Sequence, residues 1–267
     1  MKKVLVALGC LVMGGIGLIT VLLFNLGPVV KTAVNFYGPE IIGSGVGVEA
    51  VDASIFSAQA HFTNFFLDNP DGFTAPRAME VHSLWLNVDA SSLMTETIII
   101  DRIEVAGPEI NYEIKGGTNN FSVIMKSIKD ALPPEKMPDD TTGAAQQSRK
   151  LLVRYFVLKG GRVNMTVSML QGKVVTAEFP DIVLQNIGGG KGGASPDDVL
   201  LQIFDAIHGR LTSPELTAEF VNQLKSLGIA FDGRNINEWI RGTGNDLEGV
   251  KSEIKSMGER IKGLFHR

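Results

Sequence analysis

The sequence predicts an α+β protein. An N-terminal transmembrane helix is expected to lead into a curved, mainly antiparallel β-sheet body with covering helices and a C-terminal amphipathic helix. Three patterns predict this arrangement. Residues 4–24 carry no charge, residues 43–187 repeatedly alternate apolar and polar side chains, and residues 245–267 place apolar side chains at helical steps. A period of two is typical of strands with one buried face, and steps of three and four are typical of a helix.

Residues 1–27 are predicted to contain a short cytoplasmic start and an uncleaved signal anchor. A helix needs about 20 apolar residues to cross a hydrocarbon core of ~30 Å, and residues 4–24 supply them. A cleaved signal peptide has an apolar stretch of only ~7–15 residues. Lys2 and Lys3 favour a cytoplasmic N-terminus, although Lys31 beyond the far end keeps the charge difference modest. The single cysteine, Cys10, lies in this run, where an intramembrane thiol is favoured over an acylated lipoprotein cysteine.

Residues 28–132 are predicted to form a β-rich lobe that ends in a helix. The first part, interrupted at Gly38-Pro39, indicates a short stalk or a helix that lies on the membrane surface. Two strands are expected to join near residues 52–54, a third to cover residues 79–89, and two more to flank Gly107-Pro108. Asn119 or Asn120 is expected to cap the helix that follows.

Residues 133–148 are predicted to be a linker, and residues 149–194 a second β lobe. The linker is rich in Pro, Asp, Thr, Gly, Ala and Gln, a composition typical of a boundary between lobes. A weak internal repeat relates residues 103–112 to residues 156–165, since each segment has a glycine between two strand patterns. This match suggests that one module is used twice.

Residues 195–244 are predicted to form a helical pair with its connection. Ser195 and Ser213 each precede a proline and an acidic residue, which is the pattern of a capped helix start. Residues 245–267 are predicted to form an amphipathic helix with a heptad-like seam. Three interpretations of the seam stay open: a helix that packs on the core, a helix on the membrane surface, or a short coiled coil with a partner or a second copy. The seam consists of Leu247, Val250, Ile254, Met257, Ile261 and Leu264.

The sequence contains no recognisable active site, so we expect no enzymatic activity, catalytic residue, cofactor or metal. The glycine-rich loop 188–193 lacks the Ser or Thr that follows Gly-Lys in a phosphate-binding loop, which favours a flexible connection. The four histidines are scattered without ligand spacing. The net charge of -4 and the lack of a basic stripe argue against nucleic acid as a partner.

An ordered set of motifs follows the apolar run. The set comprises residues 45–51, Phe56-Ser57-Ala58, Asn69-Pro70-Asp71-Gly72-Phe73, residues 84–88, residues 98–103, Gly107-Pro108-Glu109-Ile110 and Asn119-Asn120-Phe121. This order resembles the N-terminal region of AsmA-like bacterial envelope proteins. The resemblance implies an inner-membrane anchor and a periplasmic β-rich body, and larger members resemble bridges that hold lipid in an apolar groove. This chain is short, because six to nine strands give only about 30–45 Å of groove, so one copy is not expected to form a complete bridge.

The resemblance leads us to expect a non-enzymatic, single-pass protein of the bacterial inner membrane with a cytoplasmic N-terminus and a periplasmic body. It would handle phospholipid or another acyl-chain ligand in envelope or outer-membrane biogenesis. The candidate groove residues come from two predicted strand faces, and the alanines beside large side chains would leave room for a lipid. These residues are Phe56, Ala58, Ala60, Phe62, Leu84, Leu86 and Val88.

The alternative function is a membrane-anchored scaffold without lipid cargo, in which the helices of the protein cover the same sheet face. An open apolar face of several hundred Å² would favour the lipid function, since such a surface demands a ligand or partner.

Overall fold

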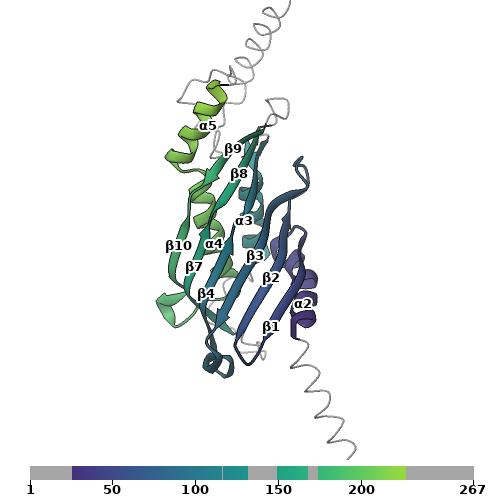
Figure 1. Ribbon diagram of the computed structural model, residues 1–267, viewed down its shortest axis with the longest axis vertical. Helices are drawn as coiled ribbons and strands as arrows, with labels where there is room; N and C mark the ends of the chain where they lie inside the picture. Colours follow the sequence, from purple (N-terminus) through teal and green to yellow (C-terminus); the bar gives the residue numbers. More distant parts are fainter. Residues whose placement is uncertain (1–25, 116, 132–148, 168–173, 227–267) are drawn as a thin grey trace, which may run out of the picture.

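A single ten-stranded sheet with helices packed against it forms the body of the protein (Figure 1). The structure is a computed structural model that describes residues 26–115, 117–131, 149–167 and 174–226. The helices are α2 (Leu26–Ile42), α3 (Asn120–Ala131), α4 (Pro196–Leu211) and α5 (Pro214–Ser226), with short 3-10 helices η1 (Ala90–Met94) and η3 (Gly189–Lys191). The strands are β1 (Val46–Ser54), β2 (Gln59–Asp68), β3 (Arg77–Val88), β4 (Thr97–Ala106), β5 (Glu109–Lys115), β6 (Thr118–Asn119), β7 (Lys150–Lys159), β8 (Gly161–Val167), β9 (Val174–Phe179) and β10 (Ile182–Ile187).

These elements confirm an α+β fold with a mainly β body. Within the described residues, no helix is both long and apolar enough to cross a membrane. The predicted membrane-spanning run, the predicted linker 133–148 and the C-terminal seam from Leu247 to Leu264 all lie outside the described residues.

Strands from before and after the predicted linker pair directly. β4 is parallel to β7 and β5 is parallel to β8, whereas the other strand pairs are antiparallel. The two predicted lobes therefore share one sheet. The weak internal repeat coincides with this pairing, because Ile103 lies opposite Phe156 and Tyr112 lies opposite Met165.

The long strands are interrupted at one level, which we call the break line. Gly107 separates β4 from β5 and Gly160 separates β7 from β8, with φ angles of 59° and 64°. Asn64 in β2 has a φ of 52° at the same level. A residue in this left-handed region disturbs the strict alternation of a strand. In β3, Val81 is buried and Leu84 packs against the same core, although they are three positions apart. Apolar side chains on both sides of the break line therefore reach one face.

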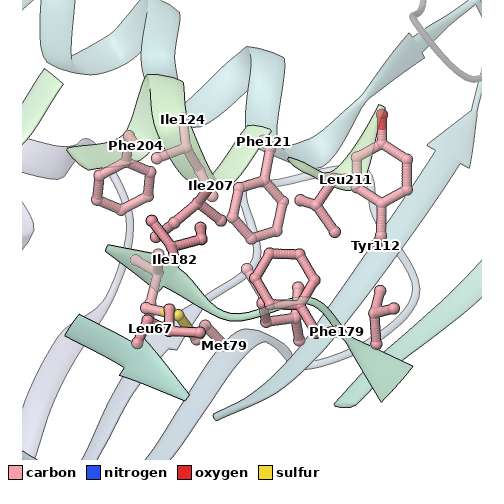
Figure 2. Close-up of a cluster of buried hydrophobic side chains, with 14 of the residues drawn as sticks. Leu67, Met79, Tyr112, Phe121, Ile124, Phe179, Ile182, Phe204, Ile207 and Leu211 are labelled. Atoms are coloured by element: carbon pink, nitrogen blue, oxygen red, sulfur yellow. The ribbon is translucent and has the colours of Figure 1, made fainter. Parts of the chain in front are cut away.

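Helices α3, α4 and α5 cover part of that face. Figure 2 shows side chains of α3 and α4 packed over strand residues such as Phe179 and Ile182. The ring of Phe121 lies 6.1 Å from that of Tyr112 and 6.3 Å from that of Phe204. Burial raises the pKa of Tyr112. Since Phe121 is fully buried, this cluster joins the helices firmly to β5.

The predicted caps are confirmed. The Ser122 amide donates to the side-chain oxygen of Asn119 at 2.7 Å, which identifies Asn119 as the capping residue of α3. Ser195 accepts from the Asp198 amide at 3.1 Å, and Ser213 accepts from the Leu216 amide at 3.3 Å.

Helix α2 packs along the edge strand β1, and two of its polar side chains bond the backbone of that strand. The ammonium of Lys31 donates to the Glu49 carbonyl at 2.6 Å, and Asn35 exchanges hydrogen bonds with the backbone N–H and carbonyl of Val48 at 2.8 and 3.4 Å. These bonds occupy backbone groups that an edge strand would otherwise offer to another chain. The outward side of α2 is mostly apolar, with Phe36 70% and Tyr37 57% exposed.

Candidate functional site

The candidate residues of β2 and β3 lie side by side on one face of the sheet. Ala60 pairs with Leu86, and Phe62 pairs with Leu84, in antiparallel register. Val88 follows Leu86 by two positions and therefore points to the same face. All five side chains are half-buried. We call Ala60, Phe62, Leu84, Leu86 and Val88 the apolar row.

Phe56 and Ala58 do not belong to this strand face, so the prediction that they alternate with Ala60 and Phe62 was wrong. β1 runs to Ser54, and residues 55–58 form the turn into β2. Ala58 has a φ of 50° and its carbonyl accepts from the Val88 amide at 2.8 Å. Phe56 is 75% exposed in the turn. The turn bends the chain before the alternation of β2 begins.

The apolar row lies beside, and partly outside, the helix-covered core. On the β4 side it continues through Ile103, which pairs with Leu86, to Phe156 of β7, which is buried. Contacts of α4 with β7 and β10 cover that part of the sheet. Within the described residues, the core cluster reaches Leu84, Ile100 and Ile103 but does not include Ala60, Phe62, Leu86 or Val88. A strip of half-exposed apolar surface therefore remains on β2 and β3.

This strip lies close to the start of α2. Val51 and Ala53 of β1 pair with Phe62 and Ala60. A Cβ on Gly27 would lie 2.0 Å from the Val51 carbonyl oxygen, so only glycine allows α2 to approach β1 this closely. The chain thus enters the described structure beside the apolar row, directly after the uncharged residues 4–24.

A polar hollow of about 480 Å³ lies along the break line. Asn64 donates to the Glu49 carboxylate at 2.5 Å, and its oxygen lies 2.8 Å from Nδ1 of His82. Arg77 pairs with Glu80 at 2.9 Å in the same hollow. The hydrogen bonds and the ion pair in this hollow join β1, β2 and β3.

The structure also brings together a hydroxyl and an imidazole that sequence reasoning missed. Oγ of Ser122 on α3 lies 3.4 Å from Nε2 of His208 on α4. Burial lowers the pKa of His208, and the nearby charge of Asp205 partly opposes this shift. The residues are 86 positions apart, so no local spacing could have indicated the contact. At this length the hydrogen bond is weak, and it serves as a contact between helices.

The other described histidines have structural contacts. The ring of His61 stacks on Trp85 at 3.8 Å, and its Nε2 lies 2.8 Å from the Ser83 hydroxyl. Among the described residues, no group of three or more His, Cys, Asp or Glu side chains could hold a metal ion.

Searches against profiles of known protein families, characterised proteins and solved structures found no match to this chain. The resemblance to AsmA-like proteins stays a prediction from the motifs.

Proposed function

We propose that the protein is a single-pass inner-membrane protein whose periplasmic body holds an acyl chain of a lipid against the apolar row. The observation that carries this proposal is the half-exposed apolar strip on β2 and β3, beside the point where the chain arrives from residues 4–24. Each methylene removed from water contributes about 0.8 kcal/mol, so a few methylenes offset the cost of ordering a lipid tail.

The shape of the row supports a tail rather than a compact ligand. Ala60 is small and lies opposite Leu86, whereas Phe62 lies opposite Leu84 two positions further along β2. Ala60 would form the floor of a narrow strip, and the larger side chains would form its sides. We propose no reaction for the bound lipid. A phospholipid held in this way fits a role in envelope or outer-membrane biogenesis, as the AsmA-like motifs imply.

The test compares two alanine-to-aspartate variants of the full chain, purified in detergent, by mass spectrometry of the copurifying lipids. Ala60→Asp places a charge in the apolar row and should reduce the lipid bound per chain several-fold. Ala50→Asp is the matched control, because Ala50 is exposed on β1. Lipid that surrounds the anchor contributes equally to both variants.

Thermal unfolding distinguishes the loss of a lipid site from the loss of the fold. If Ala60→Asp loses lipid and keeps an unfolding temperature near that of the Ala50→Asp control, the proposal is supported. The proposal would be contradicted if the wild type carried no lipid and Ala60→Asp lowered the unfolding temperature strongly. Ala60 would then belong to a core that the protein itself fills.

The outward face of α2 favours the alternative function of a scaffold without lipid cargo. Phe36 and Tyr37 meet edge to face at 5.0 Å, and they line a shallow apolar hollow of about 440 Å³ with Val29 and Ala33. A protein partner could cover this face. Photo-crosslinking from position 36 to another envelope protein, together with a lipid-free wild type, would support the scaffold function.

A further inference from the structure

Exposed apolar side chains gather at one end of the sheet. Met94 in η1 is 92% exposed, and Phe56 and Ile55 in the β1–β2 turn are 75% and 38% exposed. The hydrogen bond from the Val88 amide to the Ala58 carbonyl brings the end of β3 beside this turn. Since η1 follows β3 directly, both segments lie at the same end, the lower one in Figure 1. We call Ile55, Phe56 and Met94 the apolar foot.

The start of α2 lies at this end as well. Gly27 approaches the backbone of Val51 and Ala53, near the end of β1. Residues 4–24, the uncharged run, join the body only a few positions before Gly27. Any bilayer that contains this run must therefore lie next to the apolar foot, and not next to the opposite end of the sheet.

We propose that the apolar foot contacts the surface of the phospholipid bilayer in which residues 4–24 are anchored. Phe56 and Met94 supply large apolar side chains that gain by leaving water at the level of the lipid headgroups. The Arg149 side chain donates a hydrogen bond to the Leu93 carbonyl at 2.9 Å, and Glu96 is exposed two positions after Met94. Charges of both signs therefore flank Met94. Such a pair gives no preference for anionic lipid, and zwitterionic lipid is the suitable probe.

The contact would bring the apolar row to the membrane. Val88 lies beside the turn, and Leu86 with Ala60, then Leu84 with Phe62, follow away from the foot. An acyl chain could pass from the bilayer onto the row without crossing water. This part of the inference rests on the proposed lipid function, whereas the bilayer contact itself rests only on the anchor.

The test uses the full chain with Cys10→Ser, reconstituted in phosphatidylcholine vesicles whose acyl chains carry bromine. A single fluorescent label is attached after Met94→Cys, and in a second sample after Asp71→Cys. Asp71 is exposed and lies past the other end of β2, about 30 Å from the foot. Both positions are exposed, so both labelled chains should fold as the wild type does, which thermal unfolding checks.

We expect the label at position 94 to be quenched at least twofold by the brominated lipid and the label at position 71 to keep its emission. Equal emission at both positions, with or without quenching, would overturn the proposal. A wild type without bound lipid would contradict the proposed lipid function but not the bilayer contact, which is tested by the quenching at position 94. Failure of one proposal can therefore be told apart from failure of the other.

Discussion

Asn120 donates from its side-chain nitrogen to the side-chain oxygen of Asn69 at 2.6 Å, across 51 positions of sequence. The same nitrogen donates to the Asn111 carbonyl at 2.7 Å, and the oxygen of Asn120 accepts from the Glu113 amide at 3.0 Å. One fully buried amide thus joins the segment after β2, the strand β5 and the start of α3.

This contact joins two motifs that are far apart in the sequence. Asn69 begins the motif Asn69-Pro70-Asp71-Gly72, and Asn120 belongs to Asn119-Asn120-Phe121. Glu113 completes the arrangement, since its carboxylate accepts from the amides of Thr74 and Ala75 at 2.7 and 3.1 Å. Two of the motifs that carry the resemblance to AsmA-like proteins therefore meet at the end of β2 and the start of α3.

Asn120→Ala should destabilise the fold by about 2–4 kcal/mol, because it leaves the oxygen of Asn69 and the amide of Glu113 without their bonds in a buried site. Thermal and denaturant unfolding of the full chain in detergent would measure the loss. Asn87→Ala, at a half-exposed position of β3, is the control and should cost less than about 0.5 kcal/mol. A loss no larger than that of the control would contradict the role of the network.

Gly160→Ala should cost about 1–2 kcal/mol of stability, since Gly160 holds a φ of 64° on the break line and an L-residue is strained there. Gly190→Ala is a matched control, because a Cβ at either glycine meets open space and only Gly160 has a positive φ. Denaturant unfolding of the two variants separates backbone strain from crowding. Equal stability of the two variants would contradict the predicted strain at Gly160.

The stability of the fold should fall as the pH drops below about 6.5, in part through His208. Burial lowers the pKa of this imidazole in the folded state, so the unfolded chain binds the proton more readily. The contribution is complete above the unfolded pKa and is lost as the pH falls towards the folded one. His208→Gln should flatten the unfolding temperature between pH 7 and pH 5 relative to the wild type. The same slope in both proteins would contradict this assignment.

Ser122 should not react as a catalytic nucleophile, because its hydroxyl lies 3.4 Å from the His208 imidazole and forms only a weak bond. A fluorophosphonate probe, which labels activated serines, should leave the full chain unlabelled. Labelling that disappears in Ser122→Ala would argue for an enzymatic activity.

A reporter enzyme fused after Arg267 should be active in the periplasm, since Lys2 and Lys3 favour a cytoplasmic N-terminus. A second fusion that carries Lys2→Glu and Lys3→Glu should show less reporter activity in the periplasm, because fewer chains insert with a cytoplasmic N-terminus. Activity of the first fusion in the cytoplasm alone would overturn the proposed topology.

Local chemistry in the sequence was enough to predict the helix starts and the positions of several strands along the chain. Ser195 and Ser213 could be assigned as caps because a hydroxyl, a proline and an acid act within one turn of helix. The faces of β3 could be assigned as well, since Leu84 and Leu86 alternate with the exposed Trp85. Each of these features depends on residues that are close in the chain.

Tertiary structure determined which strands, helices and side chains are neighbours. The sequence pattern from Phe56 to Phe62 reads as one strand, but the hydrogen bond from the Val88 amide to Ala58 places the first half in a turn. The pairing of β4 with β7 joins the predicted lobes into one sheet, and the packing of α3 on α4 brings Ser122 to His208. These contacts join residues that are dozens of positions apart. Their energies depend on how the whole chain packs, and local propensity carries no information about them.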